Sequence, residues 1–402
     1  VRGHQLLKGR CDLLLENFSV SAMHMTLLHT NKVLIFNQTL VGPSQITRTD
    51  PSCNKTSSPA TEDCWVHSIE YDIASNMVRP LHIIIDTFCS SGSFASNGTL
   101  VQTSGWINGD RVTRYFTLCS DSSYDWIDSP TLLSSRRRYA LNRSYQMIES
   151  SLWEAADRLA MSLYQNNLER GHFSSHFWDS ILLDYNKNQV VRTFPTMPSS
   201  GARNYPSFGY SIMLPLESAN NFQRVEILIC GGAPNGAFKK ATFNQMSVEA
   251  LKSCRRMEIT SQNPQWKMED MPRPRVVNDK LILRTGEVLI INSAKQGTAS
   301  WQSTREPVLS PFLYRRAVEA LSNWFRVLVP TKIPQMYHST ANVLPDRWVL
   351  VGGRNSNFGY RFSGVAFPIE LRMEAYIPYY LHLFYYWSSI DEFSHLDIFI
   401  LS

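Results

Sequence analysis

Five short runs rich in β-branched residues recur along the chain, and each is flanked by a turn. The runs are NKVLIFN at 31–37, GTLVQTSGW at 98–106, VEILICGGA at 225–233, GEVLIINSA at 286–294 and RWVLVGGRN at 347–355. Such runs, bounded by Gly, Asn or Ser, are typical of strands. The intervals between them, counted from positions 32, 99, 226, 287 and 348, are 67, 127, 61 and 61 residues. The long interval is close to two periods, and a repeat of about 60 residues with several strands per unit predicts a β-propeller.

The segments before these runs are punctuated by Pro and Gly, as in 271–291 and 333–353, and read as strand, turn, strand. This is the pattern of a kelch-like blade. We expect an all-β, kelch-like propeller of about seven blades over residues 1–376, with its functional loops gathered around the central axis.

Two stretches depart from the repeat. Residues 150–180 read as an amphipathic helix followed by a segment rich in His and aromatic residues, and they lie inside the double-length interval. We expect one blade to be damaged or replaced there. Residues 377–402 are dense in Tyr, Phe, Trp and Leu without strand alternation, and we expect them to be the vestigial start of a second domain.

Composition excludes several functions. The chain has a net charge of +5, only 18% of its residues are charged, and 43% are apolar, so we expect a folded protein without a nucleic-acid partner. No apolar run reaches the roughly 18 residues that a membrane-spanning helix needs. The G-x-S-x-G, H-E-x-x-H, P-loop and G-x-G-x-x-G motifs are absent.

Sequons and cysteines favour a secreted, glycosylated protein. Five N-x-S/T sequons lie within the first 150 residues, at Asn17, Asn37, Asn54, Asn97 and Asn142. Seven cysteines lack zinc-site spacing, and the short polar loops they close favour disulfides Cys53–Cys64 and Cys230–Cys254. An odd thiol then remains, either buried and inert or committed to other covalent chemistry.

Four residues in loop-like contexts are candidates for a functional site: Cys89 in IDTFCSSG, Tyr139 in SSRRRYAL, and the adjacent Tyr337 and His338 in IPQMYHST. Imidazole and phenolate are suitable ligands for copper. Each candidate also has a structural alternative, since a loop Cys is often only buried and a Tyr often only packs. His24 and His67 lie in strand-like runs, and we expect them to be structural.

Several longer segments carry a resemblance to a known family. They are LLLENFSVSAMHM, CWVHSIEYD, DTFCSSGSFASNGTLVQTSGW, RNYPSFGYSIMLPL, the C-G-G-A run at 230–233, W-x-M-E-D-M-P-x-P-R at 266–275, Y-H-S at 337–339 and FGYRFSGVAFPIELRMEAY. On these motifs the chain resembles the plant-type glyoxal oxidases, which belong with galactose oxidase among the copper radical oxidases. The resemblance covers residues 11–149 and 181–376.

The resemblance implies an enzyme that oxidises small aldehydes, such as glyoxal or methylglyoxal, to carboxylic acids while O₂ is reduced to hydrogen peroxide. It implies a copper ion and a Cys-Tyr radical cofactor, with Cys89 joined to Tyr139 through a thioether. Tyr139, Tyr337 and His338 would be the copper ligands, and Tyr337 would accept the substrate proton. It further implies a monomer that is secreted to the extracellular space or cell wall, although this chain shows no signal peptide.

The chain also departs from the family. The second equatorial histidine comes from a C-terminal immunoglobulin-like domain, and we expect the chain to be truncated before that domain. Arg138 stands where these oxidases carry Trp beside the radical Tyr. The alternative hypothesis is therefore a catalytically inactive propeller, either a binding module or the product of a truncated gene.

Overall fold

The computed structural model describes residues 9–49, 63–119, 123–130, 133, 159–163, 180–184, 189–198, 203, 206–316 and 324–381. Within these residues the regular structure is almost entirely β, apart from helix α3 (Ala237–Phe243), a 3-10 turn, η2 (Ser218–Asn220), and a helical turn at 379–381. Five four-stranded sheets are present, each antiparallel and built mostly from strands consecutive in sequence.

The strands and their sheets are as follows. Sheet β2-β3-β4-β5 contains β2 (His24–Leu27), β3 (Lys32–Phe36), β4 (Ser68–Asp72) and β5 (Met77–Leu81). Sheet β6-β7-β8-β9 contains β6 (Ser91–Phe94), β7 (Leu100–Thr103), β8 (Thr113–Phe116) and β9 (Trp126–Ser129). Sheet β13-β14-β15-β16 contains β13 (Tyr210–Met213), β14 (Glu226–Cys230), β15 (Ser253–Glu258) and β16 (Lys267–Asp270).

Sheet β17-β18-β21-β22 contains β17 (Asp279–Ile282), β18 (Val288–Ile291), β21 (Phe312–Tyr314) and β22 (Phe325–Val327). Sheet β1-β25-β24-β23 contains β1 (Arg10–Leu15), β25 (Met373–Ile377), β24 (Val349–Gly352) and β23 (Thr340–Val343). A three-stranded sheet contains β10 (Leu159–Leu163), β11 (Ser180–Asp184) and β12 (Gln189–Thr193), and a hairpin pairs β19 (Ala294–Gln296) with β20 (Arg305–Pro307).

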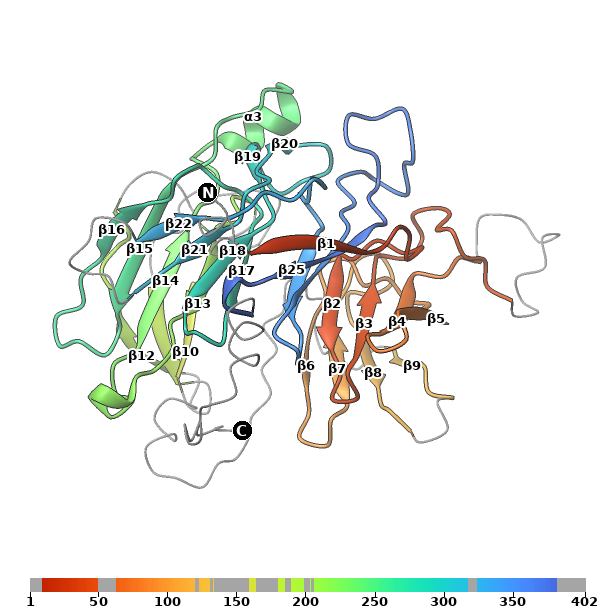
Figure 1. Ribbon diagram of the computed structural model, residues 1–402, viewed down its shortest axis with the longest axis horizontal. Coiled ribbons are helices and arrows are strands. Elements are labelled where there is room, and N and C mark those ends of the chain that lie inside the picture. Colours follow the sequence, from red (N-terminus) through yellow and green to blue (C-terminus); the bar gives the residue numbers. More distant parts are fainter. Residues whose placement is uncertain are drawn as a thin grey trace, which may run out of the picture.

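The sheets are arranged in a ring. The ring is closed by pairing between the first and the last strands of the described chain. β1 is the outer strand of a sheet whose other three strands come from residues beyond 339, and it pairs antiparallel with β25 (Figure 1). The inner strands of four neighbouring sheets are in contact: β2 contacts β23, β23 contacts β17, and β17 contacts β13. Radially arranged sheets with inner strands in contact are the architecture of a β-propeller. The predicted fold class is confirmed, with six blade-like sheets among the described residues.

All five predicted runs are strands, namely β3, β7, β14, β18 and β24. Each is the second strand of its sheet when the strands are counted from the one that comes first in the repeat, which is β23 in the last sheet. The helix predicted within 150–180 is wrong over Leu159–Leu163, because this segment is β10 and pairs residue by residue with β11. Cross-strand pairing there overrides local helix propensity. Apart from Ser180, which begins β11, the other residues of that stretch lie outside the described ranges.

The predicted tail contributes to the last sheet where it is described. Ile377 completes β25, and Tyr380 and Leu381 pack in the same buried cluster as Val349 and Val351. Residues 382–402 lie outside the described ranges.

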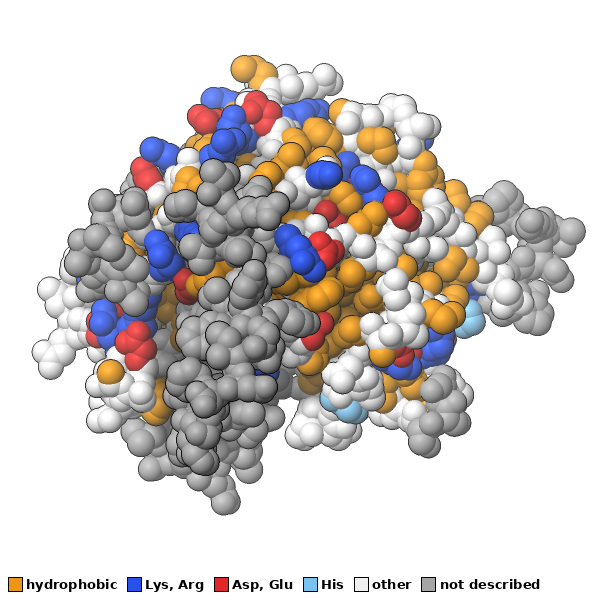
Figure 2. Space-filling view, viewed as in Figure 1, with side chains coloured by type: hydrophobic (Ala, Val, Ile, Leu, Met, Phe, Trp, Pro, Cys, Tyr) orange, Lys and Arg blue, Asp and Glu red, His pale blue; other side chains and the backbone are white. Residues whose placement is uncertain are grey.

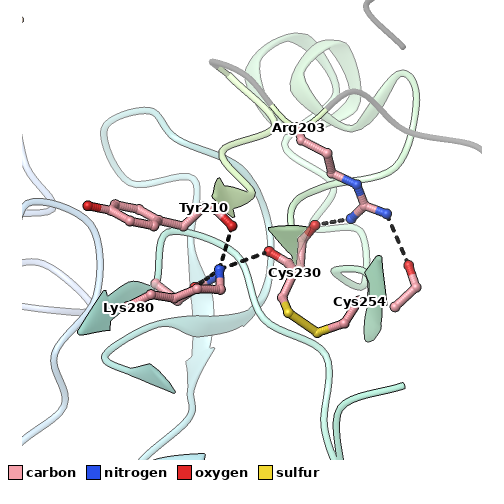
Figure 3. The surroundings of a disulfide bond; sticks show 8 residues. Arg203, Tyr210, Cys230, Cys254 and Lys280 are labelled. Carbon is pink, nitrogen blue, oxygen red and sulfur yellow. Dashed lines mark hydrogen bonds between the residues drawn. A yellow bond between two sulfur atoms is a disulfide. The ribbon is translucent and has the colours of Figure 1, made fainter. Parts of the chain in front are cut away.

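The predicted Cys230–Cys254 disulfide is confirmed and joins β14 to β15 at directly opposite positions (Figure 3). Two buried basic side chains lie beside it. Lys280 donates to the carbonyl oxygens of Tyr210 and Cys230, and Arg203 donates to the carbonyl of Gly231 and the hydroxyl of Ser253. Cys64 is also disulfide-bonded, and its predicted partner, Cys53, lies outside the described residues.

On the face seen in Figure 2 the described acidic and basic side chains are interspersed with apolar ones. Within the part of the chain that is described, no helix has the length and apolar character required to cross a membrane.

Candidate functional site

Tyr337 and His338 form a rigid pair in the turn that leads into β23. Their ring centroids lie 3.8 Å apart, the phenol of Tyr337 is buried, and His338 adopts a positive φ of 63°. His338 Nδ1 lies 3.1 Å from the carbonyl oxygen of Asn355. A ring N–H donated to a carbonyl fixes the tautomer and leaves the opposite nitrogen, Nε2, as a metal ligand.

The protonation state of this histidine suits such a role. Burial, followed by the nearby His24, lowers the pKa of His338 from 6.5 to about 3. The imidazole is therefore neutral at physiological pH, as a metal ligand must be.

Cys89 lies in the loop that precedes β6, and its backbone is held in an uncommon conformation. Its side chain is buried and its φ is +64°, a region that non-glycine residues enter only when the surrounding structure imposes it. The following Ser90 donates its backbone N–H to the carbonyl of Thr87, and Ser90 Oγ accepts a 2.7 Å hydrogen bond from Gln102.

Phe88 brings the Cys89 loop to the Tyr337–His338 pair. Its ring meets the His338 imidazole edge to face, with centroids 5.5 Å apart. The structure therefore gathers three of the four predicted site residues into one region, although they come from the two ends of the sequence. The fourth, Tyr139, lies outside the described residues, and its position relative to Cys89 stays a prediction.

Sequence reasoning missed a group of aromatic rings around this pair, which we call the aromatic wall: Phe88, Trp106, Trp301 and Phe358. Trp301 is its centre, with ring centroids 5.5 Å from Phe88, 5.8 Å from Trp106 and 4.8 Å from Phe358. Phe358 is 51% exposed, so the wall reaches the surface. The Trp301 indole nitrogen is buried and has no hydrogen-bond partner among the described residues. The sequence signal was that Phe88, Trp106 and Phe358 lie within segments that carry the family resemblance.

His24 is half-buried and His67 is buried, and both are hydrogen-bonded, as their structural interpretation predicted. His24 Nε2 lies 3.3 Å from the carbonyl oxygen of Thr87, and its ring stacks on Phe36. His67 Nε2 lies 2.8 Å from a carboxylate oxygen of Asp63. Burial lowers the pKa of His24 to about 4, so it too is neutral.

Asn37, one of the predicted glycosylation sites, is fully buried. Its amide nitrogen donates to the phenol oxygen of Tyr360 at 3.2 Å. Asn17 and Asn97 are exposed, and Asn54 and Asn142 lie outside the described residues.

The donor set is not a conventional metal cluster. Among the described residues no group of three or more His, Cys, Asp or Glu side chains could hold a metal ion. One imidazole beside one phenol is nevertheless a donor pair that suits copper, since copper accepts nitrogen and oxygen ligands together.

Comparison with known proteins finds one protein family and several relatives. Residues 23–148 and 173–380 match the glyoxal oxidase N-terminus family. The chain is 36% identical to aldehyde oxidase GLOX1 of Arabidopsis thaliana over 411 residues, which cover 93% of this chain and 66% of that protein. It is 35% identical to aldehyde oxidase GLOX of Vitis pseudoreticulata, covering 93% of this chain and 76% of that one. The chain thus spans about two thirds to three quarters of these relatives.

A solved structure has a similar fold. A fungal alcohol oxidase of the AA5 family, in complex with copper, matches with a TM-score of 0.55 over 92% of this chain and 76% of its own, at 13% sequence identity.

Proposed function

Since the chain belongs to the glyoxal oxidase family, we propose that it is a copper radical oxidase that converts small aldehydes to carboxylic acids while O₂ is reduced to hydrogen peroxide. The observation that carries the proposal is the contact between Phe88 and His338. This contact places the loop of Cys89, the predicted cross-link cysteine, against the predicted copper ligands. A propeller without a copper site would not require these residues to lie together.

Tyr337 and His338 would hold the copper, together with Tyr139. Copper supplies one of the two electron equivalents that aldehyde oxidation requires, and a Tyr139 side chain joined to Cys89 through a thioether would supply the other. The buried Tyr337 phenol would hold the proton removed from the aldehyde hydrate. The hydrogen bond between His338 Nδ1 and the Asn355 carbonyl would leave Nε2 as the nitrogen that binds the metal.

The aromatic wall would exclude water beside the metal and orient the substrate carbon chain. Its composition supports small or aromatic aldehydes rather than charged substrates. We further propose that the protein acts as a secreted, glycosylated monomer, supported by the exposed sequons Asn17 and Asn97 and by a disulfide that forms in an oxidising compartment.

Mass spectrometry of the copper-loaded protein tests this function. We expect the Cys89 and Tyr139 peptides to be joined with a loss of two hydrogens, by a bond that reducing agents do not cleave. Aldehyde-dependent peroxide should accompany it. Cys89→Ser should abolish the cross-link, whereas Cys119→Ser, at an exposed cysteine, should leave it intact.

Copper titration provides a second measurement. His338→Gln should weaken copper binding by at least about 100-fold, because even residues that only orient metal ligands contribute 10- to 100-fold. His82→Gln, at an exposed histidine, is the matched control. A folded, copper-exposed protein with neither cross-link nor peroxide would refute the proposal and support the inactive propeller.

A further inference from the structure

Arg114 lies in β8, away from the copper ligands, yet its side chain reaches two loops of the site. It is fully buried. Nη1 donates to the carbonyl of Ser104 at 2.6 Å, Nη2 donates to the carbonyl of Asp86, and Nε lies 3.4 Å from a carboxylate oxygen of Asp128. The first carbonyl belongs to the loop that carries Trp106, and the second to the loop that carries Cys89.

The two loops pack directly on each other at the Asp86 carbonyl. A Cβ atom added to either Gly105 or Gly109 would overlap this oxygen. The backbone N–H of Asp86 also donates to the side-chain oxygen of Asn108 at 3.0 Å. Glycine is required at both positions because the Asp86 backbone occupies the space of a side chain.

The Asp86 carboxylate extends this arrangement toward Cys89. One of its oxygens accepts hydrogen bonds from the backbone N–H of Thr39 at 3.1 Å and of Phe88 at 3.3 Å. Asp86 is therefore held through three groups: its carbonyl accepts from Arg114, its N–H donates to Asn108, and its carboxylate accepts from two backbone N–H groups. These contacts hold the backbone just before Cys89 and explain how Cys89 keeps its positive φ.

We propose that Arg114 is a positioning residue that clamps the Cys89 loop to the Trp106 loop and so holds the Cys89 thiol in place for cross-linking. A guanidinium suits this task because its planar fork donates in two directions at once, whereas a lysine ammonium donates from one point. Burying the charge is costly unless it is paired. Here two carbonyls accept hydrogen bonds from Nη1 and Nη2, and the Asp128 carboxylate, 3.4 Å from Nε, supplies the counter-charge. The contacts of the clamp are made by protein groups alone; only its purpose, the cross-link, rests on the proposed function.

Thiol labelling of the copper-free protein tests the clamp. The protein is exposed briefly to iodoacetamide, and labelling is measured by peptide mass spectrometry at Cys89, Cys11 and Cys119. Cys119 is exposed and should react fastest. Cys11 lies in β1, where burial raises the pKa of its thiol to about 12, and it should react slowly. Labelling at Cys11 therefore reports opening of the β1–β25 pair that closes the ring.

Arg114→Lys should raise the labelling rate at Cys89 by about tenfold, as expected for a local opening made easier by roughly 1.4 kcal/mol, and leave Cys11 unchanged. Arg255→Lys is the matched control, since Arg255 lies in β15 of another sheet, is equally buried, and donates to the carbonyl of Pro198. This control should not raise Cys89 labelling selectively.

Gly109→Ala tests the same contact without changing Arg114. It should also raise Cys89 labelling selectively, because the added methyl group would overlap the Asp86 carbonyl and lie too close to Arg114 Nη2, and so push the two apart from the Trp106 loop. Equal increases at Cys89 and Cys11, or a Cys89 that stays protected in both variants, would mean that Arg114 supports only the fold. If the clamp holds but the copper-loaded protein forms no cross-link and no peroxide, the proposed function fails and the clamp stands.

Discussion

Glu226, at the start of β14, is the centre of a buried charge network, and its neutralisation should destabilise the protein strongly. Its carboxylate is 2% exposed and lies 2.7 Å from Arg316 Nε, 3.1 Å from Arg224 Nη2 and 3.4 Å from Arg256 Nη1. Arg256 is itself 1% exposed and Arg316 is 13% exposed. In Glu226→Gln these two guanidiniums would remain buried without their shared counter-charge.

The magnitude follows from these distances. Charges about 3 Å apart attract by about 5 kcal/mol at an effective dielectric constant of about 20, and breaking a buried pair costs about 3–5 kcal/mol net. We expect about 3 kcal/mol, the lower end, for two reasons. Glutamine keeps one acceptor oxygen, and Arg256 keeps Glu269 at 3.5 Å. The pair with Arg224 adds little because Arg224 is 33% exposed.

Urea unfolding followed by tryptophan fluorescence measures the change. The matched control is Glu258→Gln, which removes a carboxylate 35% exposed and 3.0 Å from Arg224, and should cost less than about 1 kcal/mol. Equal losses in the two variants would refute the reasoning, because burial would then not decide the strength of these pairs. So would a Glu226→Gln protein as stable as the unmodified one.

Three further predictions concern single residues. Enzymatic deglycosylation in heavy-oxygen water should mark Asn97, which is exposed, and leave Asn37, which is fully buried; a mark on Asn37 would contradict its placement. Burial raises the pKa of Asp279 from 3.8 to about 7. The folded protein then binds a proton that the unfolded chain releases, so this group's contribution to stability falls as pH rises from about 4 to about 7. Asp279→Asn should flatten that part of the stability profile, and unchanged urea midpoints would contradict this. Trp301→Ala should raise KM for an aromatic aldehyde by up to about tenfold, from a loss of about 0.5–1.5 kcal/mol of ring contact, and change KM for formaldehyde little. An equal change for both would place the ring outside the substrate path.

Three of the predicted strands could be recognised because they are buried on both faces. β14, β18 and β24 are buried at every position, so their sequences are nearly continuous apolar runs. Outer strands lack this signal. β12 and β16 are mostly exposed, and their sequences resemble loops. The period of the repeat was therefore visible in the sequence, whereas the width of each blade was not.

Local patterns also failed where long-range contacts decide. The N-x-S/T pattern at Asn37 contains no information on burial. In the structure the Asn37 side-chain amide is buried and donates a hydrogen bond to the Tyr360 hydroxyl. The segment at Leu159–Leu163 reads as helix because the partner strand that determines its conformation begins only at Ser180. In both cases the deciding residue lies too far along the chain for a local pattern to include it.

The same reasoning separates the site residues that were predicted from those that were missed. Cys89, Tyr337 and His338 stand in motifs that a family resemblance carries. Arg114 stands in an ordinary strand sequence, and it acts through backbone carbonyls, which every residue possesses. The backbone carbonyls of Asp86 and Ser104 leave no trace in the residue types of these loops. Their hydrogen bonds to Arg114 can therefore be recognised only in the folded structure. A site whose reacting groups are specified by side chains is thus held in place by interactions that the sequence does not display, and Arg114 tests whether those interactions contribute to the chemistry.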